Sequence, residues 1–216
     1  QQQIINLLTT DTTSMLRVVL LYTWMTCIWV GRGQPGMNVG LTLCDLHGAS
    51  STYTETIEAE STARYGYVRR IVASGCPNHN SQCQKDGICE DGDTEAAVLD
   101  KDVKLPAYPC IADTPYDITC VEDSIGITLN GVSIFSQAGN TQCDDAIVAE
   151  GTTFDACSGH ATPDGIYHYH VAPACLLDQL NDSSTTSTGH SPQIGWAYDG
   201  FPVYGPHGSD GAFIYP

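Results

Sequence analysis

Two histidines in the stretch Asp164–Val171 have the type and spacing needed to bind a metal ion. Isoleucine, valine and tyrosine favour strands, and Asp-Gly favours a turn, so the stretch is predicted to be a turn that leads into a short strand. Alternate side chains of a strand lie on one face. His168 and His170 should therefore point the same way, about 7 Å apart along the strand. We expect the two histidines to bind a metal or a polar ligand, while Tyr167 and Tyr169 pack into a core on the other face.

Further histidines lie in neighbouring motifs and decide between two interpretations of this strand. The predicted metal ligands are His160, His168, His170 and His190. Neutral imidazoles on strands suit Zn²⁺ or Cu²⁺. His79 and Asp199 are predicted to support the ligands through hydrogen bonds, and Asp199 could add a carboxylate. The alternative is a buried polar network, in which each imidazole bonds a backbone group or a tyrosine hydroxyl.

Composition excludes several classes of protein. Hydrophobic residues make up 42% of the 216 residues and charged residues only 15%, which is typical of a globular chain and not of a disordered one. The formal net charge of −17 argues against nucleic acid as a partner. It suits a soluble extracellular protein, and it could also attract Ca²⁺ to acidic loops. Asp91, Asp93 and Glu95 form one such loop, although a solvated turn is the simpler interpretation.

The ten cysteines predict disulfides. Their even number and wide spacing, with few lysines, indicate up to five bridges formed in an oxidising compartment. No pair has the CxxC spacing of a thiolate zinc site. Proximity along the chain favours a bridge between Cys157 and Cys175, on either side of the histidine strand.

Residues 15–30 form an apolar segment that follows a polar arm at residues 1–14. The segment is short for a membrane helix and carries Arg17, and fourteen residues precede the start that a signal peptide would need. Valine, isoleucine, tyrosine and tryptophan favour a strand that is buried on both faces. This strand could be central in the chain's own sheet. It could instead be donated to another copy of the chain, which would build a filament. The residues predicted to insert are Val18, Leu20, Tyr22, Trp24 and Ile28.

Short β-prone segments separated by turns continue through the chain. The clearest hairpin is predicted over residues 125–135, around Asn130-Gly131, the pair preferred in tight primed turns. A second strand–turn–strand unit is predicted over residues 190–205, around Asp199-Gly200, and one helical turn at residues 175–180. Asn181 begins a glycosylation acceptor pattern. We predict a mainly β, disulfide-stabilised, sandwich-like domain with long loops, no membrane span, and three parts: residues 1–14, 15–67 and 68–216.

Several of these motifs together resemble one family, the YHYH domain. They are Ser74–His79, Ile127–Phe135, Ser158–His160, Asp164–Gly165, Tyr167–His170 and His190–Pro206. The resemblance covers about residues 68–206 and implies a secreted or surface-exposed β-rich domain. Relatives usually continue into an acidic, cysteine-containing tail, so we expect the sequence to be incomplete at that end.

The resemblance implies no established activity, so two functional hypotheses remain. The leading one is an extracellular structural protein that assembles with copies of itself by strand donation. The alternative is a secreted metal-binding protein or metal-dependent hydrolase that uses the histidines. A hydrolase needs a vacant metal position, and the sequence has no GxSxG elbow or HExxH helix.

Overall fold

The computed structural model describes residues 5–6, 19–21, 42–45, 47–80, 95–121, 123–140, 142–182 and 189–214. The fold is mainly β, as predicted. The strands are β1 (Ile5–Asn6), β2 (Val19–Leu21), β3 (Tyr53–Ala59), β4 (Tyr67–Ala73), β5 (Lys101–Pro106), β6 (Pro115–Asp117), β7 (Ser124–Thr128), β8 (Ser133–Phe135), β9 (Gly159–Ala161), β10 (Tyr167–Tyr169), β11 (Gln193–Ala197) and β12 (Pro202–Tyr204). The helices are α1 (Ala146–Glu150), the 3₁₀ turn η1 (Gly151–Thr153) and α2 (Ala174–Gln179).

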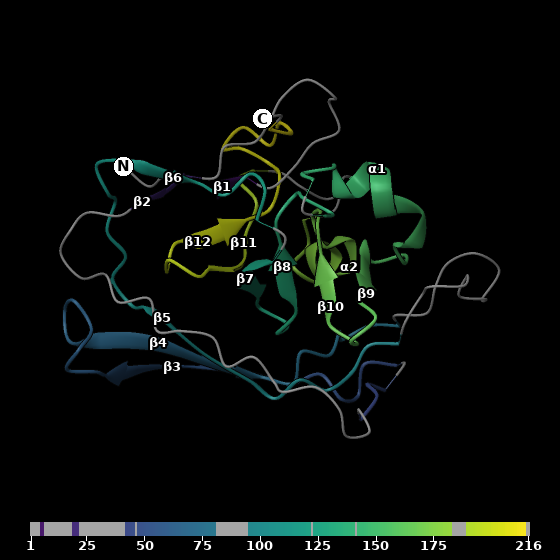
Figure 1. The fold of residues 1–216 in the computed structure, drawn as a ribbon, viewed down its shortest axis with the longest axis horizontal. Coiled ribbons are helices and arrows are strands. Elements are labelled where there is room, and N and C mark those ends of the chain that lie inside the picture. The colour runs from purple at the N-terminus through teal and green to yellow at the C-terminus, as the bar shows by residue number, and fades with distance from the viewer. Residues whose placement is uncertain are drawn as a thin grey trace.

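The strands form one large sheet and two small ones. The large sheet has the order β1-β12-β11-β7-β8-β10-β9. Strand β10, which carries the histidines, runs parallel to β8 and antiparallel to β9. The small sheets are β3-β4-β5 and β2-β6. In Figure 1 the large sheet fills the centre of the view, β3-β4-β5 lies below and to the left, and α1 and α2 lie beside β9 and β10.

The three-stranded sheet packs one face on the large sheet. Ile71 of β4 and Leu105 of β5 are fully buried against Ile127 of β7. Arg69 extends this contact, because its guanidinium lies 3.6 Å from the centroid of the Trp196 ring. The result is a two-layer, sandwich-like core.

The hairpin predicted over residues 125–135 is confirmed, but its turn is of another type. Strands β7 and β8 pair antiparallel, and the Val132 carbonyl accepts a bond from the Thr128 N–H. Of the central residues only Gly131 has a positive φ, of 83°, whereas a primed turn at Asn130-Gly131 needs a positive φ at Asn130 as well (type I′) or instead (type II′). The loop is therefore one residue longer than predicted. A Cβ on Gly131 would lie 2.7 Å from the Cβ of Ala73, so glycine also allows the hairpin tip to approach β4.

Three disulfides join the described parts of the chain. They are Cys44–Cys76, Cys120–Cys143 and Cys157–Cys175. The last is the bridge expected from proximity, and it ties the start of β9 to α2. Closing a loop of this length contributes about 3 kcal/mol in the chain-entropy model. Cys27, Cys83 and Cys89 lie outside the described residues.

Much of the predicted N-terminal strand also lies outside the described residues. Within residues 15–30 the structure describes β2, where Leu20 pairs with Tyr116 of β6 in the same chain. Val18, Tyr22, Trp24 and Ile28 are not described, and neither are Asp91 and Asp93 of the acidic loop. Within the arm at residues 1–14, β1 pairs parallel with β12. Among the described residues, no helix is long and apolar enough to cross a membrane.

Candidate metal centre

Strand β10 separates two kinds of side chain, as its sequence predicts. Tyr167 and Tyr169 are each 1% exposed and face a core cluster with Val132. His168, at 2% exposure, and His170, at 7%, face the other way. The alternation follows from the period of two residues in a strand. It gives each face of β10 its own chemistry.

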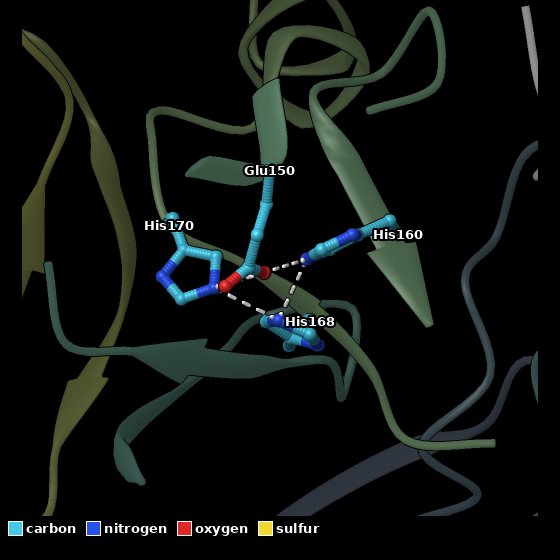
Figure 2. A group of neighbouring side chains, drawn as sticks. All are labelled: Glu150, His160, His168 and His170. Atoms are coloured by element: carbon cyan, nitrogen blue, oxygen red, sulfur yellow. Dashed lines mark hydrogen bonds and ion pairs between the residues drawn. The ribbon is translucent and has the colours of Figure 1, made fainter. Parts of the chain in front are cut away.

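Four side chains converge on the histidine face. The Nε2 atom of His168 lies 2.9 Å from Nε2 of His160 and 3.0 Å from Nε2 of His170. An oxygen of Glu150 lies 3.2 Å from Nε2 of His160 and 3.7 Å from Nε2 of His170. Figure 2 shows all four groups pointing toward one small space. Their separations are close to the roughly 3.3 Å expected between ligands of a tetrahedral zinc ion at about 2.05 Å.

The outer ring nitrogens of two histidines carry their protons. Nδ1 of His168 lies 2.9 Å from the Ile166 carbonyl oxygen, and Nδ1 of His170 lies 2.6 Å from that of Ser136. A carbonyl oxygen only accepts, so both Nδ1 atoms are donors. In the neutral rings, both Nε2 atoms are then unprotonated, and each carries a lone pair.

The third histidine has the same arrangement through a hydroxyl. Nδ1 of His160 lies 2.6 Å from Oγ1 of Thr153. That hydroxyl donates to the Glu150 carbonyl oxygen at 2.7 Å, so it accepts from the Nδ1–H of His160. The Nε2 atoms of the three histidines therefore converge at hydrogen-bond distances, but each carries a lone pair and none carries a proton.

Burial keeps these imidazoles neutral. It lowers the pKa of His160 to about 4 and that of His168 to about 3, and it also lowers the pKa of His170. Aromatic rings enclose the group: Phe135 stacks on His168 at 4.0 Å, and Phe154 lies edge-on to His160 at 4.9 Å. A neutral imidazole with a fixed tautomer and a dry surround is the usual state of a metal-binding histidine.

Glu150 was not among the predicted ligands. It is the last residue of α1, a short helix that begins at Asp145, whose side chain caps the Ile147 and Val148 N–H groups. Gly139 leaves room for it, since a Cβ at that position would lie 2.5 Å from a Glu150 carboxylate oxygen. The cap is visible in the sequence as an aspartate before an Ala-Ile-Val run, but the approach of the carboxylate to β9 and β10 depends on tertiary packing.

Three predicted site residues lie elsewhere. The His190 Nδ1 lies 2.7 Å from the Ser191 carbonyl, and its ring packs edge-on to Tyr204 of β12. Strands β8 and β7 separate that region from β10. Asp199 caps the β11–β12 turn by accepting the Phe201 N–H at 3.2 Å. Sheet order therefore places His190 and Asp199 away from the three converging histidines.

The third, His79, belongs to the tyrosine face of β10. Its Nε2 lies 3.0 Å from the Tyr167 hydroxyl, which donates to Asp155 at 2.5 Å. Asp155 also accepts the N–H groups of Cys157 and Gly159 at 2.8 and 3.1 Å. Burial raises the pKa of Asp155 and lowers that of His79. This is the predicted polar network, but it lies on the face opposite the three converging histidines.

Two other polar groups resemble chemical sites without having their geometry. His79 lies beside Cys157 and Cys175, whose sulfurs are joined in a disulfide and are not thiolate ligands. Ser191, Asp182 and His207 have the composition of a hydrolase triad. Ser191 donates its hydroxyl proton to Asp182, and the same His207 Nδ1 faces both partners at 3.4 and 3.2 Å. Ser191 is 2% exposed, so the group is a buried junction.

Fold and site together define a disulfide-stabilised β-rich domain with a buried histidine cluster on its YHYH strand. The family model described as "YHYH protein" matches residues 102–212, which is just over half of the chain. The chain belongs to this family. Searches of curated proteins and of solved structures find no match.

Proposed function

We propose that this YHYH protein binds one transition-metal ion, Zn²⁺ or Cu²⁺, through Glu150, His160, His168 and His170. The observation that carries the proposal is the convergence of three imidazole lone pairs with no shared proton. Lone pairs at this separation repel one another unless a cation lies between them. A carboxylate beside them supplies negative charge for a divalent ion.

The donor set favours a structural ion. Four protein ligands complete a tetrahedral shell, whereas catalytic zinc sites usually keep one position for water. Four nitrogen and oxygen donors that converge on one point suit Zn²⁺, while Cu²⁺ prefers a flatter arrangement. The ion would tie α1 to β9 and β10. A secreted location is consistent with this role, because the disulfides require an oxidising compartment.

Elemental analysis of protein purified without added metal or chelator tests the proposal. We expect about one equivalent of Zn or Cu per chain, and His168→Ala with His170→Ala should remove it. His190→Ala is the matched control, because it deletes a histidine outside the cluster and should leave the metal content unchanged. Finding no stoichiometric metal in the wild-type protein, even after incubation with Zn²⁺ or Cu²⁺, would show that the cluster is only a polar network.

A second candidate function, assembly with copies of itself, is favoured by the N-terminal strands. Both β1 and β2 act as added strands, β1 along the outer edge of β12 and Leu20 of β2 against β6. A strand edge that accepts a short segment of its own chain can accept a longer one from a neighbour. We propose that residues 15–30 of one copy complete a sheet of the next, which extends into a filament.

Deletion of residues 1–30 tests assembly separately from metal binding. The truncated protein should be a folded monomer that keeps its metal, and a peptide of residues 15–30 should bind it. Light scattering and electron microscopy would follow the polymer in the intact chain. Polymers that persist after the deletion, or a truncated chain that stays unfolded with the peptide present, would rule out donation.

A further inference from the structure

A hollow lined by tyrosines lies where the connection between β3 and β4 meets the end of β5. In Figure 1 that connection lies at the left of the view, on the side away from β9 and β10. Tyr65, Tyr67 and Tyr108 border it and are 60%, 48% and 55% exposed. None of their hydroxyls has a hydrogen-bond partner among the described residues. Large aromatic side chains normally bury most of their surface, so three exposed rings around one hollow point to a ligand. We call this feature the tyrosine hollow.

The three rings meet at right angles. Tyr108 lies 6.2 Å from Tyr65 with an interplanar angle of 87°, and 6.3 Å from Tyr67 with an angle of 85°. These edge-to-face contacts hold the rings in place without covering all of their faces. The Arg64 guanidinium lies 5.4 Å from the centroid of the Tyr65 ring and supports it. The three rings are therefore held at fixed angles around the hollow before any ligand binds.

The floor of the hollow is apolar and its rim is polar. Val68 and Leu105 are 4% and 1% exposed, and Pro106 lies beside them. On the rim, Lys104 donates to Glu60 at 3.3 Å, and Thr62 donates to the same carboxylate at 3.1 Å. The ammonium and the carboxylate largely cancel in charge. Together they offer both donors and acceptors around flat aromatic faces.

We propose that the tyrosine hollow binds a neutral sugar ring of a polysaccharide. The C–H face of a pyranose stacks on an aromatic ring, and its hydroxyls both donate and accept hydrogen bonds, as this rim requires. An anionic ligand would meet Glu60 and a chain of net charge −17. A lipid chain would leave the paired charges of the rim facing hydrocarbon, which is costly.

Calorimetric titration of the intact protein with cellohexaose, xylohexaose and chitohexaose tests the proposal. At least one of these should bind at up to millimolar concentration. Tyr108→Ala should weaken that binding by about tenfold, the loss expected for one aromatic stacking contact. Tyr116→Ala is the matched control, because Tyr116 is 59% exposed on β6, outside the hollow, and this variant should bind within about twofold of the wild type.

Tyr108→Phe separates stacking from folding, since it keeps the ring and should retain most of the affinity. Unchanged thermal unfolding of Tyr108→Ala would show that any loss is local. The proposal is overturned if none of the three hexasaccharides binds the wild-type protein, or if Tyr108→Ala binds as tightly as the control. It is also overturned if no sugar binds and Tyr108→Ala dissociates a dimer in sedimentation, since the hollow would then be an interface between copies.

Discussion

Imidazole and carboxylate groups meet on both faces of strand β10, but their hydrogen bonding differs between the two. On the tyrosine face the protons of Tyr167 and His79 have acceptors: Tyr167 donates to Asp155, and His79 donates to Tyr167. On the histidine face the three Nε2 atoms are all acceptors, and no proton lies among them. Donors paired with acceptors stabilise a fold without a ligand, whereas converging acceptors repel one another unless a cation lies between them. The contrast therefore distinguishes a structural network from the proposed metal site by hydrogen-bond geometry alone.

The largest expected effect comes from removing a ring on the tyrosine face. Tyr167→Ala should lower the free energy of unfolding by about 3–5 kcal/mol, because it empties a fully buried site. The loss should be the same with and without chelator. Denaturant unfolding monitored by circular dichroism measures it. A loss that appears only in metal-loaded protein would contradict the separation of the two faces.

On the histidine face the effect should depend on metal. Gly139→Ala should displace the Glu150 carboxylate, because the new methyl group would lie 2.5 Å from its oxygen, and only 3.1 Å from the Cα of Ala146. We expect a loss of metal affinity of roughly 10–100-fold, as is usual when the support of a site is disturbed. Competition with a chromogenic chelator gives the affinity.

Gly189→Ala is the control for this variant, since its Cβ would have no atom of the described residues within 4 Å, its chain neighbours aside. Equal affinities for the two variants would show that Glu150 does not hold the ion. A matching loss of stability in the metal-free forms would instead mean that Gly139→Ala damages the fold.

A buried amine near the histidine face predicts a pH dependence. The Nζ atom of Lys101 donates to Ser133 at 2.6 Å, and burial lowers its pKa from 10.5 to about 7. Between these values the unfolded chain binds more protons than the folded one. The free energy of unfolding should therefore rise from pH 7 toward pH 10.5, by at most about 1.4 kcal/mol per pH unit.

Lys101→Met should remove this rise and stabilise the protein at pH 7, since no charge then has to be buried. Denaturant unfolding of both proteins at pH 7 and pH 9 measures the two slopes. Parallel slopes would show that Lys101 keeps its charge in the folded protein.

Local sequence was sufficient for the strand and its alternation. The Tyr167–Tyr169 segment, its Asp164-Gly165 turn and the hairpin around Gly131 all depend on residues within about ten positions of one another. The bridge between Cys157 and Cys175 was also within reach, because both cysteines flank that strand. The family followed from several such motifs in order.

Long-range placement was not accessible in the same way. His79, His160 and His190 have similar local contexts, yet β10 presents one face to His160 and the other to His79, and His190 lies beside β12. The order of strands in the sheet decides which of these histidines lies beside His168 and His170. No local pattern encodes that order, because it is set by the packing of the whole core.

The sequence by itself determined that β10 has a histidine face and a tyrosine face, because a strand alternates its side chains regardless of context. Only the tertiary structure decided what each face meets. It brought Glu150 from the end of α1 and His160 from β9 to the histidine face, and it placed carbonyl and hydroxyl acceptors behind all three rings. The tautomers of His160 and His170, and with them the proposed metal site, depend on contacts with other elements of the fold.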